Sequence, residues 1–275
     1  MIKKVIQCAD VHIRNYQRLE EYSQQLDKFV EKCKEIAEPY DQDEVRIVIC
    51  GDICHSKTSI SNELIVYVSN FIRELEKICK VLVISGNHDL LVNNQSRVDT
   101  ISAIFQAAQF KNAVFLDNAL EYQSGVLNDD NISWALYSIF DNFNRPNIEE
   151  VKEMFDNKHK IIGLYHGTIV GAELNNGTTM QEGMDMDTFK GCDCVMAGDI
   201  HKRQVLKRGK VEVVYSGSLI QQTFGETVSQ HGFVVWGIPS LKHEFVDLES
   251  DYGLFDIELK SLEDIDSDKE VLRNA

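Results

Sequence analysis

The chain has 275 residues, and its 28 basic residues against 44 acidic residues leave a formal net charge of −16 at pH 7. A hydrophobic content of 43% and a charged content of 26% are ordinary for a globular protein and exclude a disordered chain. The acidic balance argues against nucleic-acid binding by bulk charge, although a local basic patch or bound cations would still permit it.

Neither a membrane span nor an exported, disulfide-bonded domain is indicated. No apolar run in the sequence approaches the roughly 18 residues of a membrane helix, and polar residues interrupt the N-terminal apolar stretch. The seven cysteines are odd in number, scattered through apolar stretches and without a C-x-x-C pair, which favours buried thiols in a reducing compartment. We therefore expect a soluble cytoplasmic protein.

In the first half of the chain, short apolar strands alternate with helices. The expected strands are Val5–Cys8, Val45–Cys50 and Val81–Ile84, and the expected helices are Arg18–Glu38, Ser61–Cys79 and Thr100–Gln109. Ser61 is a plausible N-cap of the second helix. This alternation predicts parallel strands joined by right-handed crossovers.

The second half contains more strands and less helix. The expected strands are Ala113–Leu116, Ile132–Ile139, Ile161–Tyr165, Cys194–Ala197, Gln204–Lys207, Val211–Tyr215 and Phe233–Ile238. So many strands predict an α/β fold of two packed mixed β-sheets flanked by helices. Beyond Pro239 the pattern weakens into strand-like pieces at His243–Leu248 and Leu254–Leu259. We expect one domain over residues 1–239 and, over 240–275, the start of a C-terminal region that is possibly truncated.

Five of the apolar strands are followed by side chains that bind metals. These side chains are Asp10 and His12 after the first strand, Asp52 after the second, Asn87 after the third, His166, and then Asp199 with His201. Ligands of an open α/β sheet bind beyond the carboxyl ends of its strands, so we expect these side chains to surround one small volume. Any one of them alone is more simply a core histidine or a turn aspartate, but five such strand ends in series indicate a site.

Seven mixed oxygen and nitrogen ligands exceed the needs of one ion and suit two ions that share a carboxylate. Asp52, in the middle of the set, is the natural bridge. Imidazole and carboxylate ligands without thiolate favour manganese, iron, zinc or magnesium.

The series Asp10-x-His12, Gly51-Asp52, Gly86-Asn87-His88-Asp89, His166 and Gly198-x-x-His201 resembles the calcineurin-like metallophosphoesterase superfamily. The sequence after Gly51-Asp52 lacks the Asp-Arg-Gly of the protein phosphatases of that superfamily, and His55 stands where SbcD-type repair nucleases have a histidine. Residues 198–204 and 215–219 are also similar to that subfamily, especially to its phage and viral members. The resemblance covers residues 1 to about 238 and implies a four-layer α/β/β/α sandwich.

The resemblance also implies the cofactors, two Mn²⁺ ions, with Mg²⁺ as a possible substitute. It assigns one ion to Asp10, His12, Asp52 and His201, and the other to Asp52, Asn87, His166 and Asp199. Asp199 is a departure, because cellular members usually have histidine there. A carboxylate still binds manganese, so we expect retained binding at a harder second site.

Three further residues are candidates for catalysis. His88 adjoins the ligand Asn87 without being needed as a ligand, which makes it the best candidate to stabilise the transition state or protonate the leaving oxygen. Asp89 could fix the tautomer of His88. The resemblance places His55 on the scissile phosphate; from the residues alone, a cap on the following loop is equally plausible.

Lys57, Lys202 and Arg203 flank the motifs and could bind DNA phosphates, or they could be solvated surface charges. What the resemblance implies is a DNA nuclease of repair and recombination, with 3′→5′ double-strand exonuclease and single-strand endonuclease activity. It also implies an SMC-like ATPase partner of the SbcC type, and the host cytoplasm as location if a phage encodes the chain. The alternatives are a metallophosphoesterase acting on a small phosphodiester and a catalytically silent scaffold.

The helix expected at Ser61–Cys79 carries an apolar arc wider than one sheet needs. Together with the stripe of Ile101, Ile104, Phe105 and Ala108 on the next helix, it predicts a homodimer built on a four-helix contact. SbcD-like nucleases dimerise in a similar way. The alternative is that neighbouring segments cover the extra width within one subunit.

Overall fold

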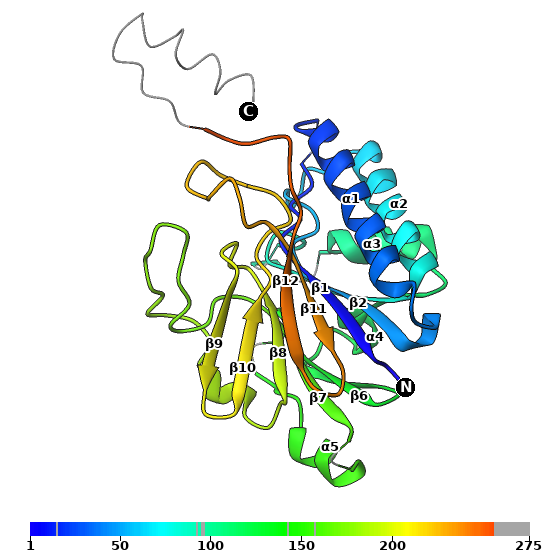
Figure 1. The fold of residues 1–275 in the computed structure, drawn as a ribbon, viewed down its shortest axis with the longest axis vertical. Helices are drawn as coiled ribbons and strands as arrows, with labels where there is room; N and C mark the ends of the chain where they lie inside the picture. Colours follow the sequence, from blue (N-terminus) through cyan, green and yellow to red (C-terminus); the bar gives the residue numbers. More distant parts are fainter. Residues whose placement is uncertain (15, 92, 95–96, 142, 157, 256–275) are drawn as a thin grey trace, which may run out of the picture.

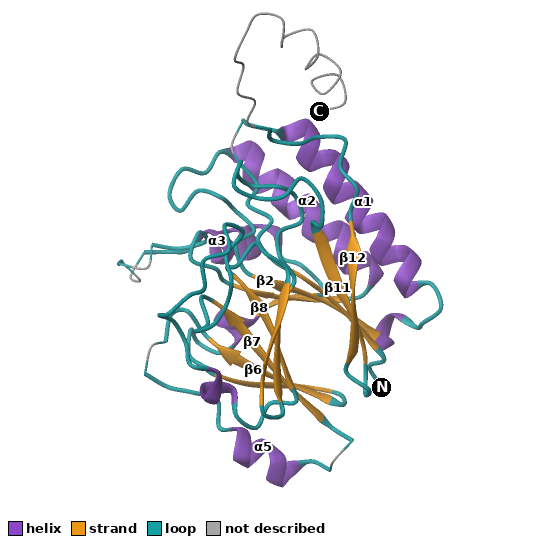
Figure 2. Cartoon of the chain, turned by 60° about the vertical axis from the view of Figure 1, so that its left-hand side comes forward, coloured by secondary structure: helices purple, strands orange, loops and turns teal. Residues whose placement is uncertain are grey.

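The computed structural model describes residues 1–255 except 15, 92, 95, 96, 142 and 157. Two six-stranded β-sheets pack face to face, and helices cover their outer faces (Figures 1 and 2). The predicted fold class is therefore confirmed. Within the described residues, no helix combines the length and the apolar character needed to cross a membrane.

Both sheets mix parallel and antiparallel strands. The first sheet has the order β12 (Lys242–Asp247), β11 (Gly232–Gly237), β1 (Lys4–Cys8), β2 (Val45–Cys50), β3 (Lys80–Ile84), β4 (Ala113–Phe115). The second has the order β5 (Gly125–Asp129), β6 (Ile132–Tyr137), β7 (Lys160–His166), β8 (Cys194–Gly198), β10 (Val211–Tyr215), β9 (Gln204–Arg208). Strands β1 to β4 are mutually parallel, as are β6, β7, β8 and β10. Each parallel set therefore brings its carboxyl ends to one edge.

The helices are α1 (Leu19–Ala37), α2 (Asn62–Ile78), α3 (Thr100–Ala108), α4 (Leu116–Ala119) and α5 (Ile148–Met154), with 3₁₀ turns at Gln42–Glu44 and Met186–Phe189. Helix α2 begins as predicted, because the Ser61 hydroxyl accepts a hydrogen bond from the amide of Leu64 at 3.1 Å. Helices α1 and α2 lie side by side over the first sheet, and α5 lies at the opposite end of the molecule (Figure 1).

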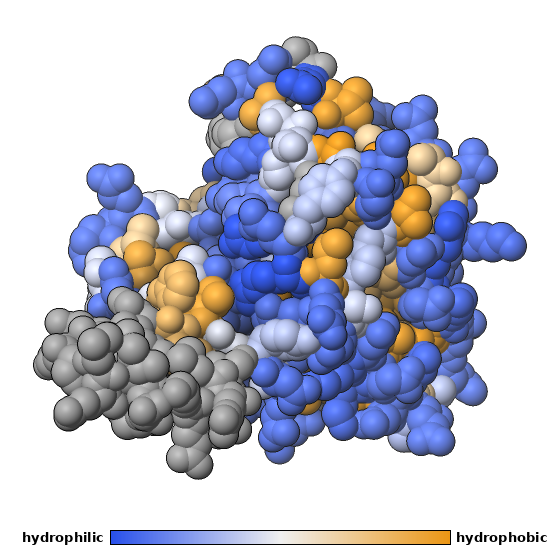
Figure 3. Space-filling view, turned by 90° about the horizontal axis from the view of Figure 1, so that it is seen from above, coloured by the Kyte–Doolittle hydropathy of each residue, from blue (hydrophilic) through white to orange (hydrophobic). Residues whose placement is uncertain are grey.

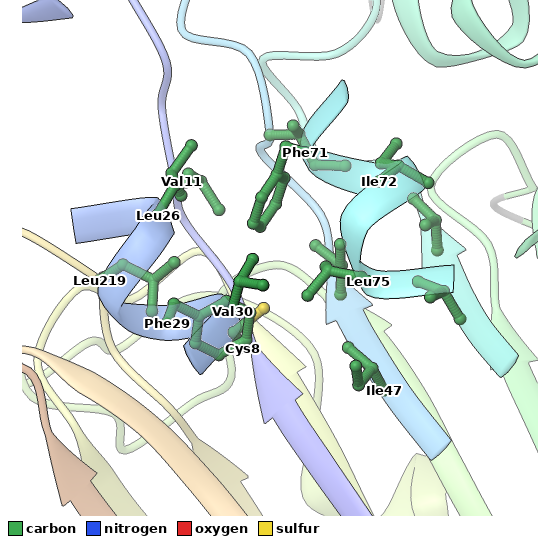
Figure 4. Close-up of a cluster of buried hydrophobic side chains, with 14 of the residues drawn as sticks. Cys8, Val11, Leu26, Phe29, Val30, Ile47, Phe71, Ile72, Leu75 and Leu219 are labelled. Atoms are coloured by element: carbon green, nitrogen blue, oxygen red, sulfur yellow. The ribbon is translucent and has the colours of Figure 1, made fainter. Parts of the chain in front are cut away.

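Three apolar layers fill the spaces between the elements. One lies between α1, α2 and α3 and the first sheet, where Phe29 of α1 and Phe71 and Leu75 of α2 share a cluster with Ile47 of β2 (Figure 4). A second lies between the two sheets and includes Trp134 and Trp236. A third covers the outer face of the second sheet under α5. Strands buried on both faces explain why the sequence shows continuous apolar runs rather than alternation.

Helix α2 has a helix on either side of it, since α1 and α3 both contact it. Phe105 of α3 packs against Phe110 and Phe115 of the same chain, with ring centroids 4.8 and 5.6 Å apart. The apolar width that motivated the homodimer is therefore partly covered within one subunit, where Ile65, Ile78 and Phe105 stay half-buried. On the face shown in Figure 3, apolar side chains are interspersed with hydrophilic ones. The dimer stays a prediction.

The domain boundary expected near Pro239 falls inside a β-hairpin. Strand β12 pairs antiparallel with β11 along its whole length, so residues 242–247 are the edge of the first sheet. Of the further strand expected at Leu254–Leu259, residues 254 and 255 have no strand pairing and 256–259 lie outside the described residues. Strand β5 and helix α5 were not expected, because a short polar hairpin and a two-turn helix give little periodicity.

Two buried polar contacts tie the sheets together. The side-chain amide nitrogen, Nε2, of Gln7 in β1 donates to the carbonyl oxygens of Ala197 and Val214 in the second sheet, at 3.2 and 2.9 Å. The guanidinium of Arg46 in β2 donates twice to the carboxylate of Asp129 in β5, at 2.8 and 3.1 Å. Because these groups are buried, losing one partner leaves the other without compensation.

We therefore predict that Asp129→Ala destabilises the fold by about 3–5 kcal/mol, because it leaves the buried Arg46 guanidinium without its carboxylate partner. Asp251→Ala is the matched control: its carboxylate is exposed and lies 3.9 Å from the Lys28 ammonium, a contact worth about 0–1 kcal/mol. Urea unfolding followed by circular dichroism measures both. Equal losses for the two variants would contradict the role given to Asp129.

Candidate metal centre

The seven predicted ligands come together where the two sheets meet. Strands β1, β2 and β3 of the first sheet and β7 and β8 of the second all end there, and each supplies residues at its last position or in the loop that follows. The residues brought together are Asp10, His12, Asp52, Asn87, His166, Asp199 and His201, linked by the distances given below. The carboxyl-end rule thus placed the site correctly, with both sheets contributing.

Four of these residues have backbone angles that residues other than glycine rarely adopt. The φ angles are 53° at Asp10, 50° at His12, 54° at Asp52 and 96° at Asp199, all in the left-handed region. Each such residue costs about 1–3 kcal/mol, and this strain clusters at functional sites. Backbone hydrogen bonds hold it in place: the amide of His12 donates to the Asp52 carbonyl at 2.9 Å.

Gly51 shows how tightly the turn before Asp52 is packed. Its φ is +86°, and a Cβ there would collide with Nδ1 of His166. Only glycine supplies both the left-handed backbone and the space.

In the first half of the site, two imidazoles point at one position. Nε2 of His12 lies 3.0 Å from Nε2 of His201 and 3.4 Å from Oδ2 of Asp52. The other nitrogen of His201 lies 2.9 Å from Oε1 of Glu226 and donates to it, so Nε2 keeps its lone pair for a ligand. Asp10 lies beside this pair, because its carboxylate groups with the two histidines within 4.8 Å.

In the second half, His166 is oriented in the same manner. Its Nδ1 lies 2.7 Å from the Cys50 carbonyl oxygen and donates to it, which leaves Nε2 facing Asp52 at 3.5 Å and Asp199 at 3.9 Å. The side-chain amide of Asn87 donates to Asp199 at 3.1 Å. The Asp52 carboxylate faces both halves, one oxygen toward each, which suits a bridging ligand.

Buried atoms without partners show that this arrangement fits metal ions. Among the described residues, Nε2 of His166 and Oδ1 of Asn87 are buried and have no hydrogen-bond partner. Each can offer a lone pair to a divalent cation, and the carboxylates around them would offset the charge of that cation. Asp10, His12, Asp52 and His201 would hold one ion, and Asp52, Asn87, His166 and Asp199 the other.

The electrostatics of the cluster also favour added positive charge. Burial raises the pKa of Asp10 to about 7, because its charged form is desolvated. Burial alone would lower the pKa of His166, but the carboxylates of Asp52, Asp10 and Asp199 hold it well above its usual range. The pKa of His12 lies well below its ordinary value because the ring is buried. A site that favours an extra proton on His166 also favours a cation there.

The role predicted for Asp89 is wrong. Its buried carboxylate does not contact His88; it accepts hydrogen bonds from the amides of Asp52 and Gly86, at 2.8 and 2.9 Å, and of Cys54 at 3.1 Å. Asp89 therefore holds the two ligand loops together, because three orphan amides converge on it. The sequence alone could not distinguish this role from that of a partner for His88, because both depend on how the loop folds.

The group that orients His88 is instead the His55 carbonyl oxygen, 2.6 Å from Nδ1 of His88. The proton on Nδ1 leaves Nε2 of His88 free to meet a substrate. The two rings stack with centroids 5.3 Å apart, and His88 also meets the ring of His12 edge-on at 4.7 Å. His88 and His55 thus lie beside the candidate ligands.

Two further polar residues at the site were missed from the sequence. Glu226 lies on an irregular loop 25 residues after its partner His201, and no periodicity marks it. Arg14 follows His12 by two residues, but the left-handed backbone at Asp10 and His12 breaks the alternation of an extended strand, so spacing alone did not mark it.

The three predicted DNA contacts differ in their surroundings. Lys202 forms an ion pair with Glu173, and Arg203 forms one with Asp247, so both charges are partly neutralised. Lys57 is exposed on the loop after His55.

Comparison with known proteins identifies the family. A model of the calcineurin-like phosphoesterases matches residues 3–217, which include every proposed ligand. The chain belongs to the calcineurin-like phosphoesterase family. Strands β11 and β12 lie beyond the matched residues, although β11 pairs directly with β1.

Similar proteins include two from viruses. The chain is 35% identical over 261 residues to the uncharacterized protein R555 of Acanthamoeba polyphaga mimivirus, covering 92% of this chain and 18% of that protein. It is 24% identical over 205 residues to the putative phosphoesterase 244L of Invertebrate iridescent virus 6, covering 74% and 66%. The chain thus spans about a fifth of the first relative and about two thirds of the second. A solved archaeal phosphodiesterase aligns with a TM-score of 0.44 at 11% identity, over 89% of this chain and 99% of that one.

The assignment of Asp199 to the second ion predicts how two substitutions behave. Asp199→Ala should weaken the binding of one Mn²⁺ ion much more than that of the other, because it removes a carboxylate that lies beside His166 and Asn87 and is held by the Thr168 hydroxyl at 2.8 Å. Asp199→His should keep both ions, since an imidazole replaces the lost ligand. Titration calorimetry measures stoichiometry and affinity; two tightly bound ions in Asp199→Ala would remove Asp199 from the ligand set.

Proposed function

We propose that this phosphoesterase is a metal-dependent DNA phosphodiesterase, the nuclease subunit of an SbcCD-like repair or recombination complex. The observation that carries the proposal is the pairing of a two-ion ligand set with two histidines, His88 and His55, beside it. The proposed activities are 3′→5′ exonuclease on duplex DNA and endonuclease on single strands. Mn²⁺ is the proposed cofactor.

The site supports phosphodiester hydrolysis for a physical reason. The negative charge of a phosphodiester repels a nucleophile, and two bound cations would neutralise that charge and supply an activated water. His88, with Nε2 free and Nδ1 tied to the His55 carbonyl, can stabilise the transferring group or protonate the leaving oxygen. Asp89 and Glu226 keep the loops and ligands in position.

Two sequence features support DNA over phosphoprotein as the substrate. The Asp-Arg-Gly that follows Gly-Asp in protein phosphatases is absent after Asp52, and His55 stands in its place. Lys57 is free to meet a DNA phosphate from its exposed position. The name of the iridescent-virus relative supports phosphoester chemistry without specifying a substrate.

A small phosphodiester is the second candidate substrate, favoured by one observation. Lys202 and Arg203, two of the three proposed DNA contacts, already have acidic partners. DNA would have to compete with Glu173 and Asp247 for them. A silent scaffold is disfavoured, because retaining every ligand with strained backbone would serve no purpose.

The assembly is proposed by resemblance: an SMC-like ATPase of the SbcC type and a second copy of the chain. Labelled duplex and single-stranded DNA, incubated with the protein with and without Mn²⁺, test the function directly. Cleavage that depends on the metal is the expected result. Hydrolysis of bis(4-nitrophenyl) phosphate with intact DNA would favour the small-substrate alternative.

For catalysis, we predict that His88→Asn lowers kcat by about 10²–10⁴-fold, the usual contribution of a positioned acid or base. Mn²⁺ stoichiometry should stay at the wild-type value, because His88 is not needed as a ligand. His159→Asn is the matched control, since His159 stacks on Phe155 outside the site. Rates and calorimetry are measured on the same preparations. Wild-type turnover in the metal-loaded His88 variant would rule out its catalytic role.

A further inference from the structure

Arg14 forms part of the wall of the pocket at the metal centre. This pocket has a volume of about 240 Å³, and its described lining includes four imidazoles and the carboxylates of Asp52 and Asp199. Among these described lining residues, Arg14 supplies the one permanently positive side chain, because a guanidinium keeps its charge at any physiological pH. The pocket therefore offers a fixed cation in addition to any metal ion.

No carboxylate among the described residues forms an ion pair with Arg14. By contrast, nearby Arg18 makes two hydrogen bonds of 2.6 Å to Glu21. Arg14 donates from one terminal nitrogen to Nε2 of His55 at 2.8 Å, and its other terminal nitrogen lies 3.5 Å from the Gln222 carbonyl oxygen. Its Nε is buried without a described partner. The guanidinium therefore keeps unused donor capacity and an uncompensated charge.

His55 adds a second unused donor at the same wall. Because a guanidinium can only donate, Nε2 of His55 must accept from Arg14, and the ring proton must lie on Nδ1. Nδ1 of His55 is buried and has no partner among the described residues. Two neighbouring side chains thus each lack an acceptor, and the oxygens of a phosphate would supply it.

The contacts also order these groups outward from the metal centre. The ring of His55 lies 5.4 Å from the ring of the ligand His12, between centroids. Arg14 contacts the ring of His55 and also Tyr22, whose hydroxyl donates to the backbone carbonyl of His12, and neither contact brings the guanidinium to the side chain of a ligand. A phosphate held at the ligands would therefore meet His88 and His55, and Arg14 would face the next anionic group of the substrate.

We infer that Arg14 binds the phosphate adjacent to the one that is cleaved, so the pocket is built for two consecutive phosphates rather than for an isolated phosphodiester. The inference deepens the proposed function and rests on it for the identity of the substrate. A third cation held by His12, His55 and His88, whose ligand atoms group within 4.8 Å, is disfavoured by the charge of Arg14.

The test compares two ligands that differ by one phosphate. Thymidine 3′,5′-bisphosphate and thymidine 5′-monophosphate are titrated into Mn²⁺-loaded protein by calorimetry. We expect Arg14→Gln to lower the affinity for the bisphosphate by about tenfold or more, as for loss of a charged hydrogen bond. The affinity for the monophosphate should stay unchanged. Arg14→Lys, which keeps the charge but loses the planar fork, should fall between wild type and Arg14→Gln.

Arg73→Gln is the matched control, because Arg73 is an exposed arginine of α2 whose guanidinium donates to the Ala108 carbonyl. It removes the same charge and should leave both affinities unchanged. Mn²⁺ stoichiometry and the thermal melting curve of each variant establish that the metal centre and the fold are intact.

If Arg14→Gln lowered the affinity for both ligands equally, or for neither, the inference would be overturned. So would a wild-type protein that does not bind the bisphosphate more tightly than the monophosphate. Because binding is measured without turnover, the result is independent of DNA cleavage. A wild-type protein that binds the bisphosphate through Arg14 but leaves DNA intact would refute the proposed nuclease and keep this inference.

Discussion

The concentration of buried acidic and imidazole groups where the two sheets meet is the constraint on which the rest of the structure depends. Asp10 and Asp52 are almost completely buried, and His166 has one ring nitrogen without a described partner. Such a cluster is unfavourable by itself, because charge is desolvated and lone pairs face one another. Divalent cations would turn the same arrangement into a favourable one. The binding of metal should therefore stabilise the fold as well as supply the chemistry.

The surrounding protein keeps this cluster from relaxing. Gln7 and the Arg46–Asp129 pair fix one sheet against the other, so the strand ends cannot drift apart. Asp89 gathers three amides from the loops, and left-handed backbone angles are retained at four ligands. The strain at the site is thus offset by packing and hydrogen bonds elsewhere in the fold.

A second group of residues determines which nitrogen each histidine presents. The Cys50 carbonyl does this for His166, Glu226 for His201 and the His55 carbonyl for His88. Each accepts a hydrogen bond from one ring N–H, so the other ring nitrogen of that histidine faces the pocket. Such outer contacts orient ligands and tune their basicity, so the chemistry of the site extends well beyond the ligands.

The sequence by itself determined the alternating strands and helices and the fold class, and it singled out the seven candidate ligands that the fold brings together. It could do so because buried parallel strands are continuous apolar runs, and the side chains after them must meet at one edge. The cap at Ser61 was likewise a local signal. The short hairpin of β5 and the helix α5 were not predicted, because so few residues give no clear hydrophobic periodicity.

Only the tertiary structure decided the contacts between residues far apart in the chain. It replaced Asp89 by the His55 carbonyl as the partner of His88, brought Glu226 to His201 and joined β12 to the first sheet. It also placed α1 and α3 against α2, so part of the apolar face that motivated the dimer is covered within one chain. The physical reason is common to all of these: hydrogen-bond partners and buried faces depend on distances in space, and loops and packed helices leave no period in the sequence from which those distances follow.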